Sequence, residues 1–343
     1  MKVLFAPDWR SGISYQQLLA KALEEQGVQV EFLSEYRRIL PLARGIRSHP
    51  TDLVHLHWPE AYFDPRNDGL DLLRRARFRM DLYLGTRNTP FVLTAHNLFP
   101  HDRTGECFVR GNIRAALSRA KRVMVHSQNS IPLLESTFGI PGDKCRVIPQ
   151  GDLSVDFGPP LPAKDAIKEL GVTAPLCLMF GMVKPYKGIE GVIDFWKLNK
   201  PEATLAIIGK PESAAYGQSL KARAGGDPNI LMHLEFLSSD NLRLWLSAAR
   251  CVIFNYAAIF NSGGAWLARS YGIPILLPSR ATTLNLNEPH PLVIRFEEED
   301  LGSSLDAALK LTPDYLLAAD WREQTSWHNV AKATARVYEE SLR

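Results

Sequence analysis

The chain has 343 residues, of which 45% are hydrophobic and 22% are charged, a normal balance for a globular protein long enough for two domains. The net charge of +3 is small, and the sequence contains no aromatic-basic RNA motif and no zinc-finger spacing, so nucleic acid is not expected as a partner. No apolar run approaches the roughly 20 residues of a membrane span, and the N-terminus has no signal-peptide core. The four cysteines are far apart and form no CxxC motif, which indicates reduced thiols and a cytoplasmic protein.

The positive charge is concentrated in the first half of the chain. Residues 1–150 carry 21 Lys and Arg against 15 Asp and Glu, whereas the remainder carries 19 against 22. Arginines alternate with apolar residues in three stretches of this half, 35–48, 72–80 and 109–123. Such segments are most often ordinary solvated helix faces, and they also suit peripheral contact with an anionic membrane, so both interpretations stay open.

Short apolar runs alternate with amphipathic helical segments along the first domain. This alternation predicts an α/β architecture in which parallel strands are joined by crossover helices, as in a Rossmann-like domain, here over residues 1–155. In chain order we expect a strand at 2–7, a helix at 14–27, strands at 28–34, 51–58 and 90–97, a helix at 110–120, a strand at 122–128, a helix at 130–138 and a strand at 145–151.

A second domain follows a proline-rich linker. The segment 152–165 contains three prolines and interrupts the pattern. The alternation then restarts, which predicts a second Rossmann-like domain over 166–327, and residues 328–343 have the spacing of a packed helix. The apolar runs expected as strands are 174–181, 203–209, 229–236, 250–256 and 273–279.

Two turns in the second domain are suited to an anion. Lys184 and Lys187 follow a strand and precede a helix that opens at Gly188, and such a turn commonly holds phosphate. Burying an unpaired ammonium is unfavourable, so a phosphate ligand is the preferred interpretation over two exposed loop lysines. Tyr186, between the two lysines, could stack on the ligand or only pack.

The second turn places Asn261 or Ser262 as the cap of a helix that begins with Gly263 and Gly264. With no side chains in the way, the amides and the helix dipole could approach a pyrophosphate closely. The alternative is a tight strand-to-helix turn without a ligand.

In the first domain, polar residues follow the strand ends, where ligands of open α/β sheets bind. His96, directly before Asn97, is expected to be functional, because a neutral imidazole can accept a proton or donate to a sugar hydroxyl. A structural role is favoured for His55 and His126. A zinc site built from the histidines is disfavoured, because no acidic or cysteine ligand lies at a recognised metal spacing beside them.

Two further features of the first domain lie near the expected ligand. Asp102 and Glu106 are the nearest carboxylates that could act as a general base, and solvated loop acids are the alternative. Arg10 and Gly12 lie in the polar turn between the first strand and the first helix, where a ligand would meet the domain.

The motifs in this order resemble the GT-B glycosyltransferases over nearly the whole chain. "FGMVKPYKGIEGVIDFW", "LAIIGKP" and "SGGAWLARSYGIPILLP" are similar to motifs of the family 4-like group, and "VIPQGD" looks like its pre-linker strand. "HLHWPE" and "TAHNLFPHD" are most similar to bacterial exopolysaccharide transferases, including the xanthan-type β-mannosyltransferases. The resemblance implies two Rossmann-like domains whose parallel sheets face an inter-domain cleft, with the helix 328–343 crossing back to the first domain.

The resemblance also implies roles for individual residues. His96 would lie at the acceptor face. Met182 stands where the family usually has an arginine, so Lys184 would supply that charge. The paired glutamates of the retaining enzymes fall on Ile259 and Leu267, which puts the retaining mechanism in doubt. The implied donor-diphosphate ligands are Lys184, Lys187, Ser262, Gly263 and Gly264, and the implied lining of the donor and acceptor cleft is Arg10, Gly12, Asn97, Tyr186, Gly209 and Asn261.

The expected activity is that of a hexosyltransferase. A sugar would move from a nucleotide-diphosphate sugar, with GDP-mannose favoured, to a glycan or a polyprenyl-linked acceptor in polysaccharide biosynthesis at the inner face of the membrane. The missing glutamates favour inversion, with His96, Asp102 and Glu106 as base candidates. No metal or other cofactor is expected, because lysines and helix amides would balance the diphosphate charge. A nucleotide-sugar epimerase and a catalytically silent nucleotide- or sugar-binding protein remain as alternatives.

Overall fold

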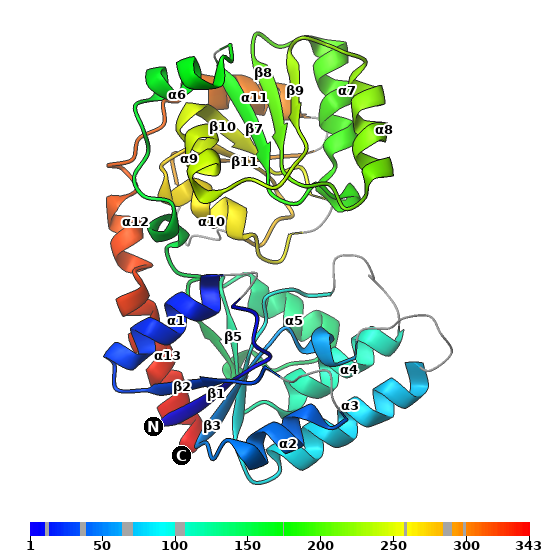
Figure 1. Cartoon of the computed structure of the whole chain (residues 1–343), viewed down its shortest axis with the longest axis vertical. Helices are drawn as coiled ribbons and strands as arrows, with labels where there is room; N and C mark the ends of the chain where they lie inside the picture. Colours follow the sequence, from blue (N-terminus) through cyan, green and yellow to red (C-terminus); the bar gives the residue numbers. More distant parts are fainter. Residues whose placement is uncertain are drawn as a thin grey trace. The chain divides into compact units, whose positions relative to one another are not determined.

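A computed structural model of the chain describes residues 1–10, 14–34, 39–63, 71–99, 107–173, 175–256, 259–283, 290–297 and 300–343 (Figure 1). The backbone forms two compact units, one of residues 1–151 with 325–343 and one of residues 152–324. From the sequence we expected the first domain to end at residue 155, the second to span 166–327, and the helix 328–343 to return to the first. Both units are α/β, so the predicted fold class is confirmed.

The first unit is built on a six-stranded parallel sheet with the order β2-β1-β3-β4-β5-β6. Its strands are β1 (Lys2–Ala6), β2 (Gln29–Phe32), β3 (Leu53–His57), β4 (Phe91–Thr94), β5 (Arg122–Val125) and β6 (Cys145–Val147). Its helices are α1 (Ser14–Glu25), α2 (Pro41–Ser48), α3 (Asp71–Thr86), α4 (Cys107–Arg119), α5 (Ser130–Phe138) and α13 (Trp327–Leu342), with short 3-10 turns η1 (Pro59–Tyr62) and η2 (Gly142–Lys144).

Most strands of this sheet are buried on both faces, as the near-continuous apolar runs predicted. Helix α1 packs against α13, and α3 packs against both α2 and α4. His55 and His57 alternate along β3 and therefore point to the same face of the sheet. The side chain of His55 bonds there to Tyr338, so α13 covers that face.

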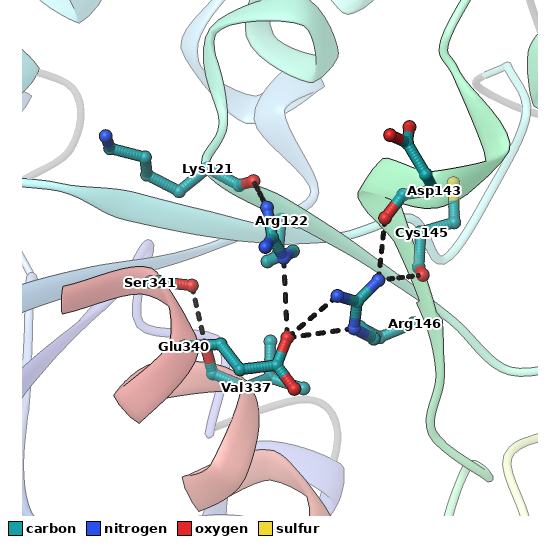
Figure 2. A network of polar contacts seen from close by, with 8 residues as sticks. All are labelled: Lys121, Arg122, Asp143, Cys145, Arg146, Val337, Glu340 and Ser341. Atoms are coloured by element: carbon teal, nitrogen blue, oxygen red, sulfur yellow. Dashed lines mark hydrogen bonds and ion pairs between the residues drawn. The ribbon is translucent and has the colours of Figure 1, made fainter. Parts of the chain in front are cut away.

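The C-terminal helix α13 is tied to the sheet by an ion-pair cluster (Figure 2). Glu340 Oε2 accepts from Nε of Arg146 at 2.9 Å and from Nε of Arg122 at 3.4 Å. These arginines belong to β6 and β5, the last two strands of the sheet order. The end of the chain is thereby attached to the edge of the first unit.

The second unit repeats this plan with the strand order β12-β11-β10-β7-β8-β9, again all parallel. Its strands are β7 (Leu176–Phe180), β8 (Thr204–Ile208), β9 (Ile230–His233), β10 (Ala249–Ile253), β11 (Ile275–Pro278) and β12 (Val293–Phe296). Its helices are α6 (Ala163–Leu170), α7 (Ile189–Asn199), α8 (Ala214–Ala224), α9 (Ser239–Ala248), α10 (Gly263–Ser270), α11 (Leu301–Lys310) and α12 (Ala319–Gln324), with the 3-10 turns η3 (Leu153–Asp156) and η4 (Pro185–Lys187).

Two hydrophobic cores cover the two faces of the second sheet. Alternate residues of β7 divide between them: Leu176 and Leu178 join the core formed with α9 and α10, whereas Cys177 and Met179 join the core formed with α7, α8 and α11. Figure 1 shows the corresponding helices on both sides of the strands. The loops that follow the carboxyl ends of these strands carry the candidate site.

Each run predicted as a strand overlaps an observed one, and the structure adds β12. This strand was missed because it is a four-residue edge strand in which three residues are only half-buried, so its apolar signal is weak. Among the described helices, none is both long enough and apolar enough to cross a bilayer.

Candidate active site

Lys187 is buried at the carboxyl end of β7. Its side chain is 7% exposed, its Nζ donates to the carbonyl oxygen of Phe180 at 3.1 Å, and Nζ lies 5.3 Å from the centre of the Tyr256 ring. Gly188, with φ of +62°, turns the chain from η4 into α7 and so folds the lysine back over the strand end. The interpretation of two exposed loop lysines is therefore wrong for Lys187.

The charge of this buried ammonium is only partly compensated. Burial, with a smaller contribution from Lys184, lowers the pKa of Lys187 to about 7. Within the described part of the chain no carboxylate forms an ion pair with it. A ligand anion placed here would restore the charged form, which is the behaviour of a binding site rather than of a structural lysine.

The N-terminus of α10 is a second anion-binding element. The Ser262 side chain caps the helix by accepting from the amide of Ala265 at 3.3 Å. No described residue accepts from the amides of Gly263 and Gly264, which are among the donors that a helix start leaves without an internal partner. Asn261 Oδ1 accepts from the indole of Trp266 at 2.7 Å and fixes the approach to the helix.

Gly264 also has a packing role that the sequence did not predict. A Cβ at this position would lie 3.2 Å from Cε1 of Phe254 and 3.3 Å from Cζ of Phe180. These contacts are tighter than usual, so the missing side chain lets α10 lie close to the sheet. The glycine pair thus serves close helix-to-sheet packing as well as the approach of a ligand.

Tyr256 connects the two anion elements and was not among the predicted residues. Its ring lies 5.5 Å from the ring of Tyr186 and close to the Lys187 ammonium, and its side chain lies near that of Ser262. The lysine turn is also joined to the end of β10, by the bond that Asn255 Nδ2 donates to the Gly188 carbonyl oxygen. The signal for Tyr256 was its position shortly after the end of β10.

Gly209 shapes the same edge through its backbone. Its φ is +133°, and a Cβ there would lie 2.2 Å from the carbonyl oxygen of Gly181. Only glycine allows the turns after β7 and β8 to approach this closely. Gly209 therefore has a clear structural reason for its identity, beside its predicted place in the ligand cleft.

In the first unit, three histidines form a hydrogen-bonded chain. His126 Nδ1 lies 2.9 Å from the carbonyl oxygen of Ile148, His126 Nε2 lies 3.2 Å from His96 Nδ1, and His96 Nε2 lies 3.0 Å from His57 Nδ1. Burial is the main cause that lowers the pKa of each, to about 4 for His126 and well below 6.5 for His57 and His96. All three are therefore neutral at pH 7.

The carbonyl of Ile148 sets the tautomers of all three hydrogen-bonded histidines. Because a carbonyl only accepts, His126 carries its proton on Nδ1 and accepts on Nε2. His96 must then donate from Nδ1 and accept on Nε2 from Nδ1–H of His57. Both ring nitrogens of His96 are thus in use, and His96 must give up its bond to His57 before it can accept a proton from a hydroxyl.

Trp58 covers the hydrogen-bonded histidines. Its ring stacks on the His96 ring with centres 3.9 Å apart and an angle of 11° between the planes. Its φ of +41° is unusual for a residue other than glycine and marks backbone strain next to the histidines, a common feature of functional sites. His55 has a structural role, as expected, because its two nitrogens bond to Tyr338 and Thr94 at 2.7 Å each.

Other predicted residues are placed as follows. Arg10 is exposed and forms a bidentate pair with Asp8, with Nε and Nη2 at 3.0 and 2.8 Å from the carboxylate oxygens, so its charge is already balanced. Asn97 is half-buried and lines a cavity of about 10 Å³ beside His96. Gly12, Asp102 and Glu106 lie outside the described residues.

The positions of the family glutamates are filled by core residues. Ile259 is 5% exposed and Leu267 is 4% exposed, and both belong to the hydrophobic core that packs on α10. No carboxylate could be supplied from these two positions. Among the described residues, no three His, Cys, Asp or Glu side chains converge in a way that could hold a metal ion.

Comparison with known proteins identifies the class. The structure matches that of Alr3699/HepE from Anabaena, solved with UDP and glucose, at a TM-score of 0.73 and 16% identity. The match covers 99% of this chain and 100% of the other. A sucrose-phosphate synthase from Thermosynechococcus elongatus matches at a TM-score of 0.71 and 14% identity over 99% and 98% of the two chains. The fold is GT-B.

The sequence comparisons carry the identification further. Residues 14–152 match the model of Glycosyltransferase Family 4. A GDP-mannose:glycolipid 4-beta-D-mannosyltransferase from Xanthomonas campestris pv. campestris is 26% identical over 302 residues, which cover 85% of this chain and 80% of the relative. These findings confirm the predicted resemblance to GT-B, family 4-like glycosyltransferases, and they support a transferase that uses a nucleotide sugar.

Proposed function

We propose that this glycosyltransferase moves mannose from GDP-mannose to a glycolipid acceptor, a polyprenyl-linked glycan in polysaccharide biosynthesis. The donor and the acceptor class follow the name of the Xanthomonas relative. The observation that carries the donor site is Lys187, a buried ammonium near the capped start of α10. Lys187 and the amides of Gly263 and Gly264 would hold the diphosphate, with Lys184, Tyr186 and Ser262 beside them.

The reaction we propose is an inverting transfer. The relative's name describes a β-linked product, and an α-linked GDP-mannose donor gives such a product with inversion at the anomeric carbon. The apolar residues Ile259 and Leu267 support this choice, because a transfer that uses the family glutamates is impossible from these positions. An inverting transfer needs one base that removes the acceptor proton and one electrophilic site that stabilises the leaving diphosphate.

The base candidates are His96, Asp102 and Glu106. A neutral His96 has the required protonation state, but its low pKa makes it a weak base and its nitrogens are engaged with other histidines. Once His96 has released His57 and accepted a proton on Nε2, it can pass its Nδ1 proton to Nε2 of His126, so the charge would be shared by two rings and the weakness would be partly offset. The separate substitutions His96→Gln, Asp102→Asn and Glu106→Gln test the assignment, and it fails if all three variants turn over near the wild-type rate.

We also propose that the enzyme needs no metal ion and works in the cytoplasm at the inner face of the membrane. Cationic and amide donors at the diphosphate support the first point, since they can supply the charge that a divalent ion otherwise supplies. The glycolipid acceptor of the relative supports the second. Turnover that is unchanged by EDTA is the expected result, and turnover abolished by EDTA and restored by a divalent ion would overturn it.

The test of function is the release of nucleoside diphosphate. Purified protein is incubated with a panel of nucleotide sugars and a membrane lipid extract, alongside Lys187→Ala and the control Lys168→Ala, an exposed lysine on α6. We expect release from GDP-mannose only, with transfer of mannose to lipid, loss of both in Lys187→Ala and no change in Lys168→Ala. Release from another donor would overturn the choice of sugar, and binding without any release would favour a catalytically silent protein.

A further inference from the structure

Helix α3 exposes a second apolar face that nothing in the described chain covers. Leu72 is 74% exposed, Leu73 66%, Tyr83 56% and Met80 51%. The opposite face of the helix is buried in the first unit, where Phe78 and Leu82 are 1% and 2% exposed. The helix therefore has one apolar face in the core of the first unit and another in solvent.

This exposed face is a continuous stripe and not a chance scatter. Residues 72, 76, 80 and 83 lie on one side of a helix at intervals of four, four and three residues. Of the 14 large apolar side chains that are exposed in the described chain, five lie on α3, and the others are distributed among many elements. Single exposed apolar residues need no explanation, but a stripe of this kind marks an interaction surface.

The charges around the stripe are positive. Arg75 and Arg79 border it on one side and Arg77 on the other, by their positions on the helix. The guanidinium groups of Arg77 and Arg79 are held by the carbonyl oxygens of Tyr62 and Gly111, at 2.9 and 3.1 Å, and keep further donors available. The neighbouring helix α4 adds Arg119, whose guanidinium carbon lies 5.0 Å from the centre of the Tyr83 ring.

Asp81 is the one acidic residue among the α3 side chains that the structure describes. Asp81 is on the buried side, where its carboxylate accepts from the amides of Leu42 and Ala43 at the start of α2, at 3.0 and 2.9 Å. This bond orients α3 by fixing its inner face to α2. The outer face is thereby presented to solvent as leucine, methionine and tyrosine side chains between arginines.

We propose that this α3 surface, defined by Leu72, Leu73, Met80, Tyr83, Arg75 and Arg79, docks the enzyme on the surface of an anionic lipid bilayer. Apolar side chains would enter the boundary of the acyl chains, while arginines reach the lipid phosphates. A symmetric contact with a second copy is disfavoured, because the same face would then oppose arginine to arginine. The inference rests on the proposed lipid-linked acceptor, for which it names the contact with the membrane.

Vesicle sedimentation tests the α3 surface. The experiment compares wild-type protein, the triple variant Leu72→Ser/Leu73→Ser/Met80→Ser and the control Leu198→Ser. Each is mixed with vesicles of phosphatidylcholine alone or with vesicles in which about 30% of the lipid is phosphatidylglycerol, which gives a negative surface potential. Leu198 is a matched control because it is 83% exposed on α7, in the other unit. We expect wild type and Leu198→Ser to bind the anionic vesicles and the triple variant to bind at least about tenfold more weakly.

Two further measurements separate this inference from the proposed function. With a detergent-dispersed acceptor, the rate at which the triple variant releases nucleoside diphosphate should stay within about twofold of the wild-type rate, because the substitutions lie outside the donor site. Vesicle binding without any transfer would leave the docking surface standing and overturn the proposed activity. No vesicle binding by wild type, equal binding by the triple variant, or a dimer in sedimentation velocity that the substitutions dissociate would each overturn the docking surface.

Discussion

The two units bury titratable side chains at the ends of their sheets in opposite ways. In the first unit, His126 and His96 are buried, neutral and bonded to one another, and the chain ends on a backbone carbonyl. In the second unit, Lys187 is buried with one carbonyl and one aromatic ring, and no described carboxylate pairs with it. Among the described residues, every ring nitrogen of the histidine chain is bonded except the buried Nε2 of His57. The lysine lacks a counter-charge, so the second arrangement is the one in which a bound anion would compensate a buried charge.

The largest expected effect comes from Lys187→Met. The rate of transfer should fall by about 10² to 10³, the usual loss when one group that stabilises a developing negative charge is removed. The free energy of unfolding without ligand should rise by about 1 kcal/mol, because an uncompensated buried charge is replaced by an apolar side chain. Turnover assays and urea titrations measure the two quantities, with Lys168→Met as control. A variant that is both inactive and less stable would show that the lysine is structural.

His126→Ala should have the opposite effect on stability. The substitution removes the link between the Ile148 carbonyl and His96, leaves a cavity and exposes two unpaired polar groups, so the free energy of unfolding should fall by about 3 kcal/mol. His233 on β9, which is only half-buried, provides the control substitution His233→Ala. If His126→Ala were as stable as wild type, the bonds of His126 to Ile148 and His96 would not contribute to the stability of the fold.

The pH dependence of nucleotide binding sharpens the same contrast. The pKa of Lys187 in the free protein is about 7, and a bound diphosphate would raise it. Below pH 7 the lysine is already charged and the affinity is at its highest. Above pH 7 each binding event must take up a proton, so the affinity should weaken by up to about tenfold per pH unit until the pKa of the complex is reached.

Calorimetric titration of GDP between pH 6 and 9 measures this slope. Lys187→Met should bind weakly and show a flat profile over the same range. A wild-type affinity that is constant from pH 6 to 9 would place the charge that recognises the diphosphate elsewhere.

The smallest expected effect is at Glu340. Its ion pairs with Arg122 and Arg146 are at the surface, and those arginines lower the pKa of its carboxyl. Glu340→Gln should reduce the free energy of unfolding by about 0.5 kcal/mol at low salt and by less in high salt, since exposed pairs are screened. Glu339→Gln, its neighbour on α13, is the matched control in thermal unfolding. A loss of several kcal/mol would mean that the attachment of α13 is far stronger than surface pairs allow.

The sequence by itself determined the class of the fold, because apolar runs of strand length alternate with amphipathic helices and restart after a proline-rich linker. It also determined the lysine turn and the glycine pair, since both follow strands directly and strand ends gather at one edge of a parallel sheet. The weak edge strand β12 was missed for the converse reason, that its residues are only half-buried.

Only the tertiary structure decided which of these groups meet and what their charges become. Lys187 and Ser262 are distant in sequence, and Tyr256, which lies beside both, belongs to neither motif. The burial that lowers the pKa of Lys187 and the hydrogen bonds that occupy both nitrogens of His96 arise from contacts between separate strands. Burial and hydrogen-bond partners are properties of neighbours in space, and local sequence patterns do not contain them.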